Sequence, residues 1–363
     1  MKRQVYLAMK TLQEAREIFF ARFGPERRTS AETIMTSDGL GRITAEAVFA
    51  KRSAPSYHSA AMDGIAVFAE KTYGATERYP KTMKIGEDGS WINTGQGLPE
   101  GLDAVIMVEK LHQIDEAHVE IRAPAYPWQH VRKVGEDIVA TQLLLPQNHR
   151  IRPYDVGALI SGGVFCLKVW EKPRVAIIPT GSELVNHRAL GAGESLRPGQ
   201  IIEYNSVVLA GLVTQSGGIP IIFDIVPDVE QGIRRALEQA VESDVHIIII
   251  NAGSSAGSKD YTVHVISEMG EVLVHGVAMM PGKPTILGVV KGKPVVGNPG
   301  YAVSSTLSFD QFVKPLIYGL LGCRPPKADR VMVQPTRDIP SRLGYPKTVS
   351  NSDRLSLPAP PRH

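Results

Sequence analysis

Cysteine, long apolar runs and an excess of charge of either sign are all scarce in this chain of 363 residues. Its two cysteines, Cys166 and Cys323, lie far apart and outside any CxxC or Cys/His cluster, so no disulfide framework or zinc site is indicated. No segment reaches the roughly 20 apolar residues that a membrane span needs. Charged residues from Lys10 to Glu17 stand where a signal peptide has its apolar core. We therefore expect a cytoplasmic protein without a membrane partner.

The balance of charge also argues against nucleic acid as a partner. Forty basic residues against 37 acidic ones leave a net charge of +3, and no long basic run is present. The ten histidines show no HxH or HExxH spacing, so zinc catalysis has no support. A GxxxxGK[ST] motif is absent as well, which excludes a P-loop enzyme.

Hydrophobic residues make up 43% of the chain, which is enough to form the cores of two to four packed domains. Residues 11–23 have helical spacing with Thr11 as N-cap, and a second short helix is expected at 30–35. Between about 45 and 140, short apolar runs alternate with Gly, Pro and Asn, which is typical of an all-β domain. A further helix is expected near residues 154–163.

From Val175 onward, strands, glycine loops and helices alternate, and this pattern predicts a doubly wound parallel sheet. Strands are expected at 175–178, 221–226, 247–250 and 295–296. Asn205 is expected to cap a helix that runs to Leu212, and Asp228 a helix that runs to Val241. The fold class is thus α/β and multidomain.

The most informative stretch is the sequence IIIINAGSSAGSKDYT at 247–262. Four isoleucines without alternation suit a strand that is buried on both faces. The next residues have little side-chain bulk, so the backbone N–H groups around Gly253, Ser254, Ser255 and Gly257 can surround an anion. Asp260 adds a carboxylate. A tight strand-to-helix turn explains this loop equally well.

Two other loops follow strands of the same expected sheet. The PTGSEL loop carries Thr180, Ser182 and Glu183, and the GNPG loop begins at Gly297 and contains Asn298. Loops at the carboxyl ends of such strands converge on one edge, so the three loops are expected to line one crevice. A helix N-cap with Glu183 in the first turn is the alternative for PTGSEL.

For several polar residues outside this crevice, an ordinary structural role is the alternative to a functional one. Asp63 fits either an exposed functional loop or an Asp-Gly turn that opens a strand. Thr94 lies in a glycine-rich loop, and Arg132 and Asp137 lie in a charged segment that suits a solvated turn. Lys283, held between prolines in PGKP, suits a rigid turn that presents an ammonium to phosphate or a simple surface turn.

Together, in this order, the motifs resemble those of the molybdopterin molybdenumtransferases, a family related to the E domain of gephyrin. The matching stretches span about residues 45–310 and are SAAMDGIAV, NTGQGLPEGLDAVIMVE, VRKVGEDI, PTGSEL, YNS, NAGSSAGSKDYT, PGKP and GNPGYAVS. The resemblance implies a helical linker domain at 1–44 and 141–172, an inserted β domain at 45–140 and an α/β molybdopterin-binding domain at 173–326. It also implies a homodimer whose sites combine the α/β domain of one chain with the β domain of the other.

The implied reaction joins adenylylated molybdopterin and molybdate, with Mg²⁺ and release of AMP. By resemblance, the acids on the α/β side, which hold Mg²⁺ or the substrate, are Glu183, Asp228 and Asp260. The β domain of the partner is expected to supply Asp63, Thr94, Arg132 and Asp137. The positions expected to bind substrate on the α/β side are Thr180, Ser182, Gly253, Ser254, Ser255, Gly257, Lys283, Asn298 and Ser304. The molybdopterin adenylyltransferase is a further expected partner.

The chain departs from the resemblance at three places. Many family members carry basic residues where this chain has Gly276 and Met280. GNPGYAVSS also differs from the commoner family form of that segment. Residues 327–363 begin like the family's C-terminal β domain and then lose the pattern of strands, so an incomplete or truncated domain is expected there. A molybdopterin adenylyltransferase-like enzyme and a catalytically weak molybdopterin-binding or scaffold protein remain the alternatives.

Overall fold

The computed structural model describes residues 9–24, 27–191, 193, 195–252 and 261–326, together with the backbone of 334–335 and 355–356. The chain divides into two compact units. One unit joins Met1–Ala31 to Trp170–His363, and the other is Glu32–Val169. Each has a hydrophobic core of its own. The chain therefore leaves the first unit after one helix and returns to it at Trp170.

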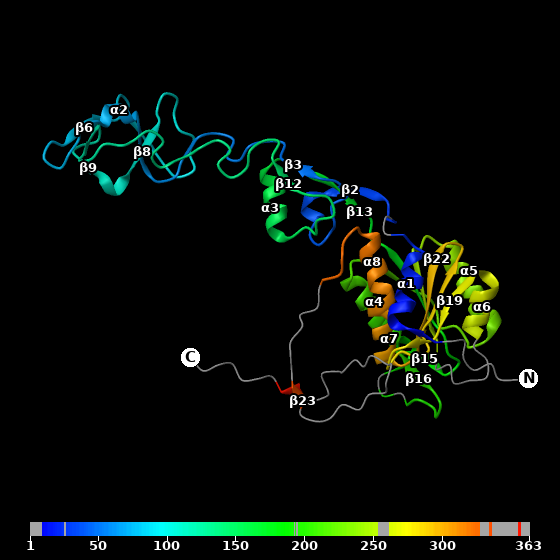
Figure 1. Ribbon diagram of the computed structural model, residues 1–363. Coiled ribbons are helices and arrows are strands. Elements are labelled where there is room, and N and C mark those ends of the chain that lie inside the picture. Colours follow the sequence, from blue (N-terminus) through cyan, green and yellow to red (C-terminus); the bar gives the residue numbers. More distant parts are fainter. Residues whose placement is uncertain are drawn as a thin grey trace, which may run out of the picture. The chain divides into compact units, whose positions relative to one another are not determined.

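The first unit is built on a six-stranded mixed sheet, shown in Figure 1. Its strand order is β17-β14-β18-β22-β21-β19. The six strands are β14 (Arg174–Pro179), β17 (Ile219–Ile222), β18 (Ile247–Ala252), β19 (Glu271–His275), β21 (Ile286–Val290) and β22 (Lys293–Pro299). The first four in the order pair in parallel, whereas β21 and β19 are antiparallel to their neighbours. The expected parallel sheet thus has an added antiparallel edge.

Helices cover both faces of this sheet. They are α4 (Asn205–Gln215), α5 (Glu230–Glu242), α6 (Tyr261–Met269), α7 (Ala302–Ser308) and α8 (Lys314–Leu320), with the π-helical turn η4 (Phe309–Val313) between the last two. Ile248 and Ile250 of β18 lie in one core with α5 and α6. Successive strand residues point to opposite faces, so Ile247 and Ile249, both fully buried, face the other side. Burial on both faces explains the uninterrupted run of isoleucines.

The first helix, α1 (Leu12–Ala21), begins where the sequence predicted. Thr11 caps it, and Thr11 and Glu14 form a reciprocal capping box. Phe19 is fully buried and meets Phe312 edge-on, with ring centroids 6.1 Å apart. Because Phe312 belongs to η4, α1 packs within the unit that carries the sheet, whereas the family resemblance implied a domain that joins it to residues 141–172.

Short elements complete the first unit. Strands β15 (Leu184–Asn186) and β16 (Ile201–Glu203) pair in parallel, and η3 (His187–Ala189) follows β15. β1 (Lys10–Thr11) pairs with β20 (Val277–Ala278). Of the expected incomplete domain at 327–363, only the backbones of β23 (Gln334–Pro335) and β24 (Leu355–Ser356) are described, and these pair antiparallel.

The second unit contains the expected all-β domain as two three-stranded sheets. One has the order β7-β5-β8 and the other β6-β10-β9. Their strands are β5 (Gly64–Val67), β6 (Lys81–Lys84), β7 (Gly89–Ile92), β8 (Ala104–Met107), β9 (Leu111–Gln113) and β10 (His118–Ile121). Both sheets are antiparallel and share a core that includes Ile65, Met83 and Val119. One helical turn, α2 (Ala69–Thr72), and a 3-10 turn, η2 (Val108–Lys110), interrupt them.

Another part of the second unit surrounds α3 (Pro153–Ser161), which confirms the helix expected there. Two short strand pairs accompany it: β2 (Ala31–Met35) with β13 (Cys166–Trp170), and β3 (Val48–Phe49) with β12 (Leu143–Leu145). A third pair, β4 (Ser59–Ala60) with β11 (Val131–Arg132), instead shares a core with β5, β7 and β8. A 3-10 turn, η1 (Thr36–Asp38), follows β2. The helix predicted at 30–35 is wrong, because this segment alternates between exposed and half-buried residues and pairs with β13. Within the described residues, no helix is long and apolar enough to cross a membrane.

Candidate functional site

A cavity of about 250 Å³ opens at the carboxyl ends of the parallel strands in the first unit. Its walls come from the loops that follow β14 and β22, from the end of β18, and from β16 with its connection to α4. The lining residues are Thr180, Glu183, Leu184, Ile201, Ile202, Glu203, Tyr204, Asn205, Asn251, Gly300 and Tyr301. The expected convergence of the PTGSEL and GNPG loops is therefore present, and Asn251 brings the end of β18 to the same place.

The PTGSEL loop is held in place by the neighbouring strands. The backbone N–H and the hydroxyl of Thr180 both donate to the carbonyl oxygen of Asn251, at 3.0 and 3.3 Å. Gly181 N–H donates to the carbonyl oxygen of Val226. The alternative of a helix N-cap is wrong, because Glu183 leads into β15 rather than into a helix. Glu183 instead lines the cavity.

Ser182 joins two of the expected site positions. Its Oγ accepts a hydrogen bond of 3.2 Å from the backbone N–H of Asp228. The loop after β14 is thereby tied to the loop that precedes α5. Asp228 was expected to cap that helix, but the N-cap is Val229, which provides no side-chain hydrogen bond.

Asn205 also differs from its expected role. It is the first residue of α4 rather than its cap, and its Nδ2 donates to the carbonyl oxygen of Gly300 at 2.6 Å. The N-cap is Tyr204, whose side chain makes no capping hydrogen bond, and Oε1 of the preceding Glu203 accepts from the backbone N–H of Ser206. Asn205 therefore links α4 to the GNPG loop across one wall of the cavity. The sequence could not reveal this contact between residues 95 positions apart.

The remaining positions on the α/β side differ in their surroundings. Asn298 is buried at the end of β22, and its Nδ2 donates to both the backbone oxygen and the Oγ of Ser305. Ser304 is buried in α7. Lys283 is half-buried before β21 and does not line the cavity. Gly253, Ser254, Ser255, Gly257 and Asp260 lie outside the described residues, so their roles stay predictions.

In the second unit, Asp63 and Thr94 form one polar pair. Thr94 donates to Oδ1 of Asp63 from its backbone N–H at 2.7 Å and from its hydroxyl at 2.9 Å. These hydrogen bonds, first the backbone one and then that of the side chain, hold the pKa of Asp63 below its usual value. Asp63 also stands in the turn that opens β5 at Gly64, so the plainer interpretation of this segment is confirmed as well.

Arg132 and Asp137 form the second polar pair of this unit. The guanidinium of Arg132 bonds the carboxylate of Asp137 and contacts Oε1 of Glu136 at 3.4 Å. These two acids, Asp137 first, raise the pKa of Arg132. The turn between them contains Gly135 at a φ of 75°, a value that favours glycine. The segment is therefore a charged turn, as one interpretation of the sequence predicted.

Strand β4 lies between the two pairs. Its Ser59 pairs with Arg132 on one side, and the 94–97 loop bonds it on the other through Gly95 N–H to Ala60 O and a bridge from Ser59 to Gly97. Asp63 and Thr94 thus flank one edge of β4, while Arg132 and Asp137 flank the other. Four residues expected to act together belong to one small region of the second unit.

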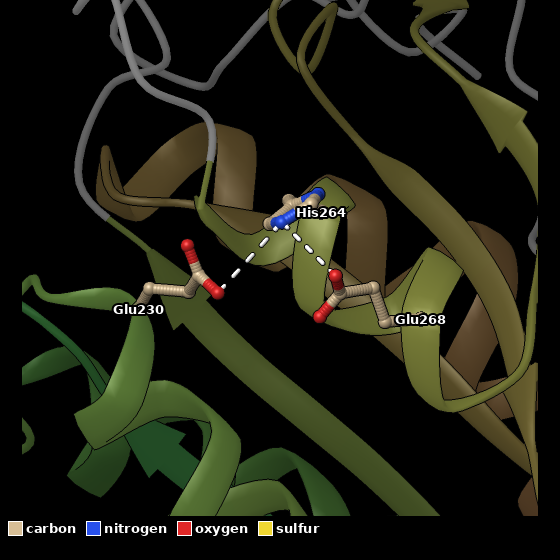
Figure 2. A group of neighbouring side chains, drawn as sticks. All are labelled: Glu230, His264 and Glu268. Atoms are coloured by element: carbon tan, nitrogen blue, oxygen red, sulfur yellow. Dashed lines mark ion pairs between the residues drawn. The ribbon is translucent and has the colours of Figure 1, made fainter.

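A further cluster of polar residues joins the first residue of α5, Glu230, to two residues of α6, His264 and Glu268. Figure 2 shows His264 between Glu230 and Glu268, at 3.7 and 3.3 Å from their carboxylates. The potential ligand atoms lie within 4.8 Å of one another, as in a metal site. Arg234, however, bonds both glutamates, and its hydrogen bond lowers the pKa of Glu268. We therefore interpret the cluster as a cross-link between α5 and α6.

Two domain families match the chain. Residues 10–163 match the MoeA N-terminal region, domains I and II, and residues 176–319 match a probable molybdopterin-binding domain. Fold, cavity and domain order define a multidomain protein with an α/β domain of the molybdopterin-binding class. Among relatives, a putative molybdopterin biosynthesis protein of Methanocaldococcus jannaschii is 33% identical over 84% of this chain and 78% of its own length. Molybdopterin molybdenumtransferase 2 of Mycobacterium tuberculosis is 32% identical over 81% of this chain and 76% of its own.

A solved structure supports the same family assignment. A molybdopterin biosynthesis MoeA protein from Pyrococcus horikoshii superimposes with a TM-score of 0.73 at 35% identity, covering 86% of this chain and 80% of that one. The chain belongs to the MoeA family of molybdopterin molybdenumtransferases. The resemblance found in the motifs is therefore confirmed, and so is the α/β multidomain fold.

Proposed function

We propose that this protein transfers molybdenum from molybdate to adenylylated molybdopterin and releases AMP, in a reaction that depends on Mg²⁺. The observation that carries the proposal is the cavity at the carboxyl ends of β14, β18 and β22, in which Glu183, Asn251 and Gly300 meet. Ligands of doubly wound sheets bind at this edge. The membership of the chain in the molybdenumtransferase family supports the reaction.

The donor set at this edge fits Mg²⁺, which prefers carboxylate and other oxygen ligands. Glu183 lines the cavity, and the hydrogen bond from Asp228 N–H to Ser182 ties the Asp228 loop to the residue next to Glu183. These two acids, with Asp260, would hold the ion. When bound, Mg²⁺ supplies charge neutralisation at the phosphoanhydride oxygens.

The residues of the chain then bind and orient the substrate. The hydroxyl of Thr180 is engaged by the Asn251 carbonyl, so Thr180 shapes the wall of the cavity. Ile201 and Leu184 add apolar surface suited to a flat ring system. Water adds to a phosphorus of the phosphoanhydride, so AMP leaves and molybdopterin keeps its phosphate. The two dithiolene thiols of molybdopterin then bond to molybdenum, and their two protons leave with one molybdate oxygen as water.

The second unit is proposed to complete the site of a partner subunit in a homodimer. Asp63 and the Arg132–Asp137 pair lie on both sides of β4, and the lowered pKa of Asp63 keeps it a carboxylate well below neutral pH. An arginine that is paired with an acid is suited to binding oxyanions when the pair opens. The molybdopterin adenylyltransferase is the proposed source of the substrate, since it makes the adenylylated form.

The test is release of AMP from adenylylated molybdopterin in the presence of molybdate and Mg²⁺. The wild type is expected to release AMP, and Glu183→Gln is expected to bind the substrate with little release. A protein that instead produces adenylylated molybdopterin from ATP and molybdopterin would be an adenylyltransferase. Binding without any AMP above background would identify a binding or scaffold protein.

A further inference from the structure

Three buried polar side chains form a directed hydrogen-bond chain behind the cavity. They are Asn298 on β22, Ser305 on α7 and Asn251 on β18, and none is more than 3% exposed. Asn298 and Asn251 are partners on adjacent parallel strands. Asn298 Nδ2 donates to Ser305 Oγ at 2.8 Å, and Ser305 Oγ donates to Asn251 Oδ1 at 3.3 Å.

The direction of this chain follows from its first member. Asn298 Nδ2 also lies 3.1 Å from the backbone oxygen of Ser305, and a carbonyl oxygen can only accept. The amide of Asn298 must therefore present its NH₂ group to Ser305. Since the Ser305 hydroxyl accepts this donor, its own proton is left for Asn251. The atom of Asn251 that faces Ser305 is then the acceptor Oδ1.

Fixing Oδ1 toward Ser305 turns the NH₂ group of Asn251 away from it. Asn251 lines the cavity, and no described residue accepts a hydrogen bond from its Nδ2. The other amide on the wall uses one of its two N–H donors, because Asn205 Nδ2 donates to Gly300 O. The Thr180 hydroxyl is used as well, since it donates to the Asn251 carbonyl. The carboxylates of Glu183 and Glu203 only accept.

We propose that Asn251 is a substrate-binding residue whose Nδ2 donates a hydrogen bond to an oxygen of adenylylated molybdopterin, and that Ser305 and Asn298 are positioning residues that set its orientation. This inference rests on the proposed function. A neutral donor suits this place, because a nearby cation such as lysine would compete with a metal ion for Glu183. Asn251 also directly precedes Ala252 and the glycine-serine segment that the sequence predicts to seat an anion.

The experiment measures KM and kcat for AMP release with Asn251→Ala, Ser305→Ala and the double variant. Asn251→Ala is expected to raise KM about tenfold with kcat nearly unchanged, which is the effect of losing one hydrogen bond to substrate. Ser305→Ala frees the amide to rotate and is expected to raise KM about threefold. In the Asn251→Ala background, Ser305→Ala is expected to add nothing, since the residue it orients is gone.

The matched control is Ser308→Ala. Ser308 is a buried serine on the same helix, and its Oγ contacts the Thr285 hydroxyl at 3.3 Å instead of Asn251. Its KM is expected to equal that of the wild type. Asn251→Asp keeps the shape of the side chain but turns an oxygen toward the substrate, so it is expected to raise KM more than Asn251→Ala. This isosteric variant also covers the case in which the alanine variant does not fold.

An unchanged KM in both Asn251 variants would overturn the inference, and so would equal effects of Ser305→Ala with and without Asn251. A wild type that releases no AMP would instead overturn the proposed function. The inhibition constant of AMP shows which part of the substrate carries the oxygen that accepts from Asn251 Nδ2. If the inhibition constant of AMP rises with Asn251→Ala, the oxygen belongs to the adenylate, and if it stays unchanged, the oxygen belongs to the molybdopterin part.

Discussion

Thr94 holds the Asp63 carboxylate with two hydrogen bonds to the same oxygen, 2.7 Å from the backbone N–H and 2.9 Å from the hydroxyl. A charged carboxylate accepts such bonds better than a protonated one, so its pKa falls. Asp63 is exposed, which leaves its second oxygen accessible to a ligand. The arrangement keeps an accessible acid ionised at acidic pH.

Thr94→Val tests this relationship. The variant keeps the backbone hydrogen bond, which is the larger cause of the lowered pKa, and loses that of the hydroxyl. The pKa of Asp63 is expected to rise partway toward its usual value. Carbon-13 NMR titration of the Asp63 carboxyl, assigned with Asp63→Asn, measures the shift. Thr94→Ser retains the hydroxyl and is expected to titrate like the wild type, and a valine variant that does the same would contradict the account.

Asp155 is expected to contribute to the stability of the second unit. Its buried carboxylate accepts from His149 Nε2 and from the guanidinium and backbone N–H of Arg152, and Arg152 is the first cause of its lowered pKa. Asp155→Asn is expected to lower the free energy of unfolding by about 2 kcal/mol at pH 7. Urea denaturation measures this loss.

The sign of the pH dependence follows from the lowered pKa of Asp155. Its contribution is complete above the unfolded pKa of about 4 and is lost as pH falls toward the folded value. The difference between wild type and Asp155→Asn should therefore shrink below about pH 4. Glu46→Gln removes an exposed ion pair with Lys168 in the same unit and should cost less than about 0.5 kcal/mol. A difference as large at pH 3 as at pH 7 would be inconsistent with this role of Asp155.

The helix cap at Thr11 provides a prediction for the first unit. Thr11→Ala removes the oxygen that accepts from Glu14 N–H and is expected to destabilise the protein by about 1 kcal/mol. Thr11→Ser keeps an oxygen at the same place and should differ from the wild type by only a few tenths of a kcal/mol. Equal melting temperatures of the alanine and serine variants would show that the capping box has no effect.

The sequence predicted well those features that depend on local pattern. The isoleucine run at 247–250 is a buried strand, Thr11 caps α1, and the face of α5 with Ile233 and Leu237 is buried. The sequence-based predictions failed where contacts with a segment distant in the sequence determine the local structure. Residues 31–35 pair with β13 instead of forming a helix, and Asn205 bonds Gly300 instead of capping α4.

The candidate site shows the same limit. Thr180 and Glu183 were predicted because they follow a buried strand, and both line the cavity. The roles of Ser182 and Asn298 as substrate-binding residues stay predictions. Ser305 was missed, because its role depends on the side chains of Asn298 and Asn251, which only the pairing of β18 with β22 brings together. A helical serine gives no signal of such a contact in the sequence.

A mixture of two inactive variants tests the shared site. Glu183→Gln damages the first unit, and Asp63→Asn damages the second. If the site combines units from two subunits, half of the dimers after random exchange have one intact site, and activity should recover to roughly a quarter of the wild type. Each variant alone should stay inactive after the same exchange procedure. No recovery, although mass spectrometry shows mixed dimers, would place all functional residues of a site on one chain.

The most direct test of the central claim follows AMP and molybdenum together. The protein is incubated with adenylylated molybdopterin, molybdate and Mg²⁺; released AMP is quantified, and molybdenum bound to the pterin is measured by mass spectrometry. Equal amounts of AMP and molybdenum-loaded pterin are expected from the wild type, and neither product from Glu183→Gln. AMP release without molybdenum on the pterin, or no AMP despite bound substrate, would contradict it.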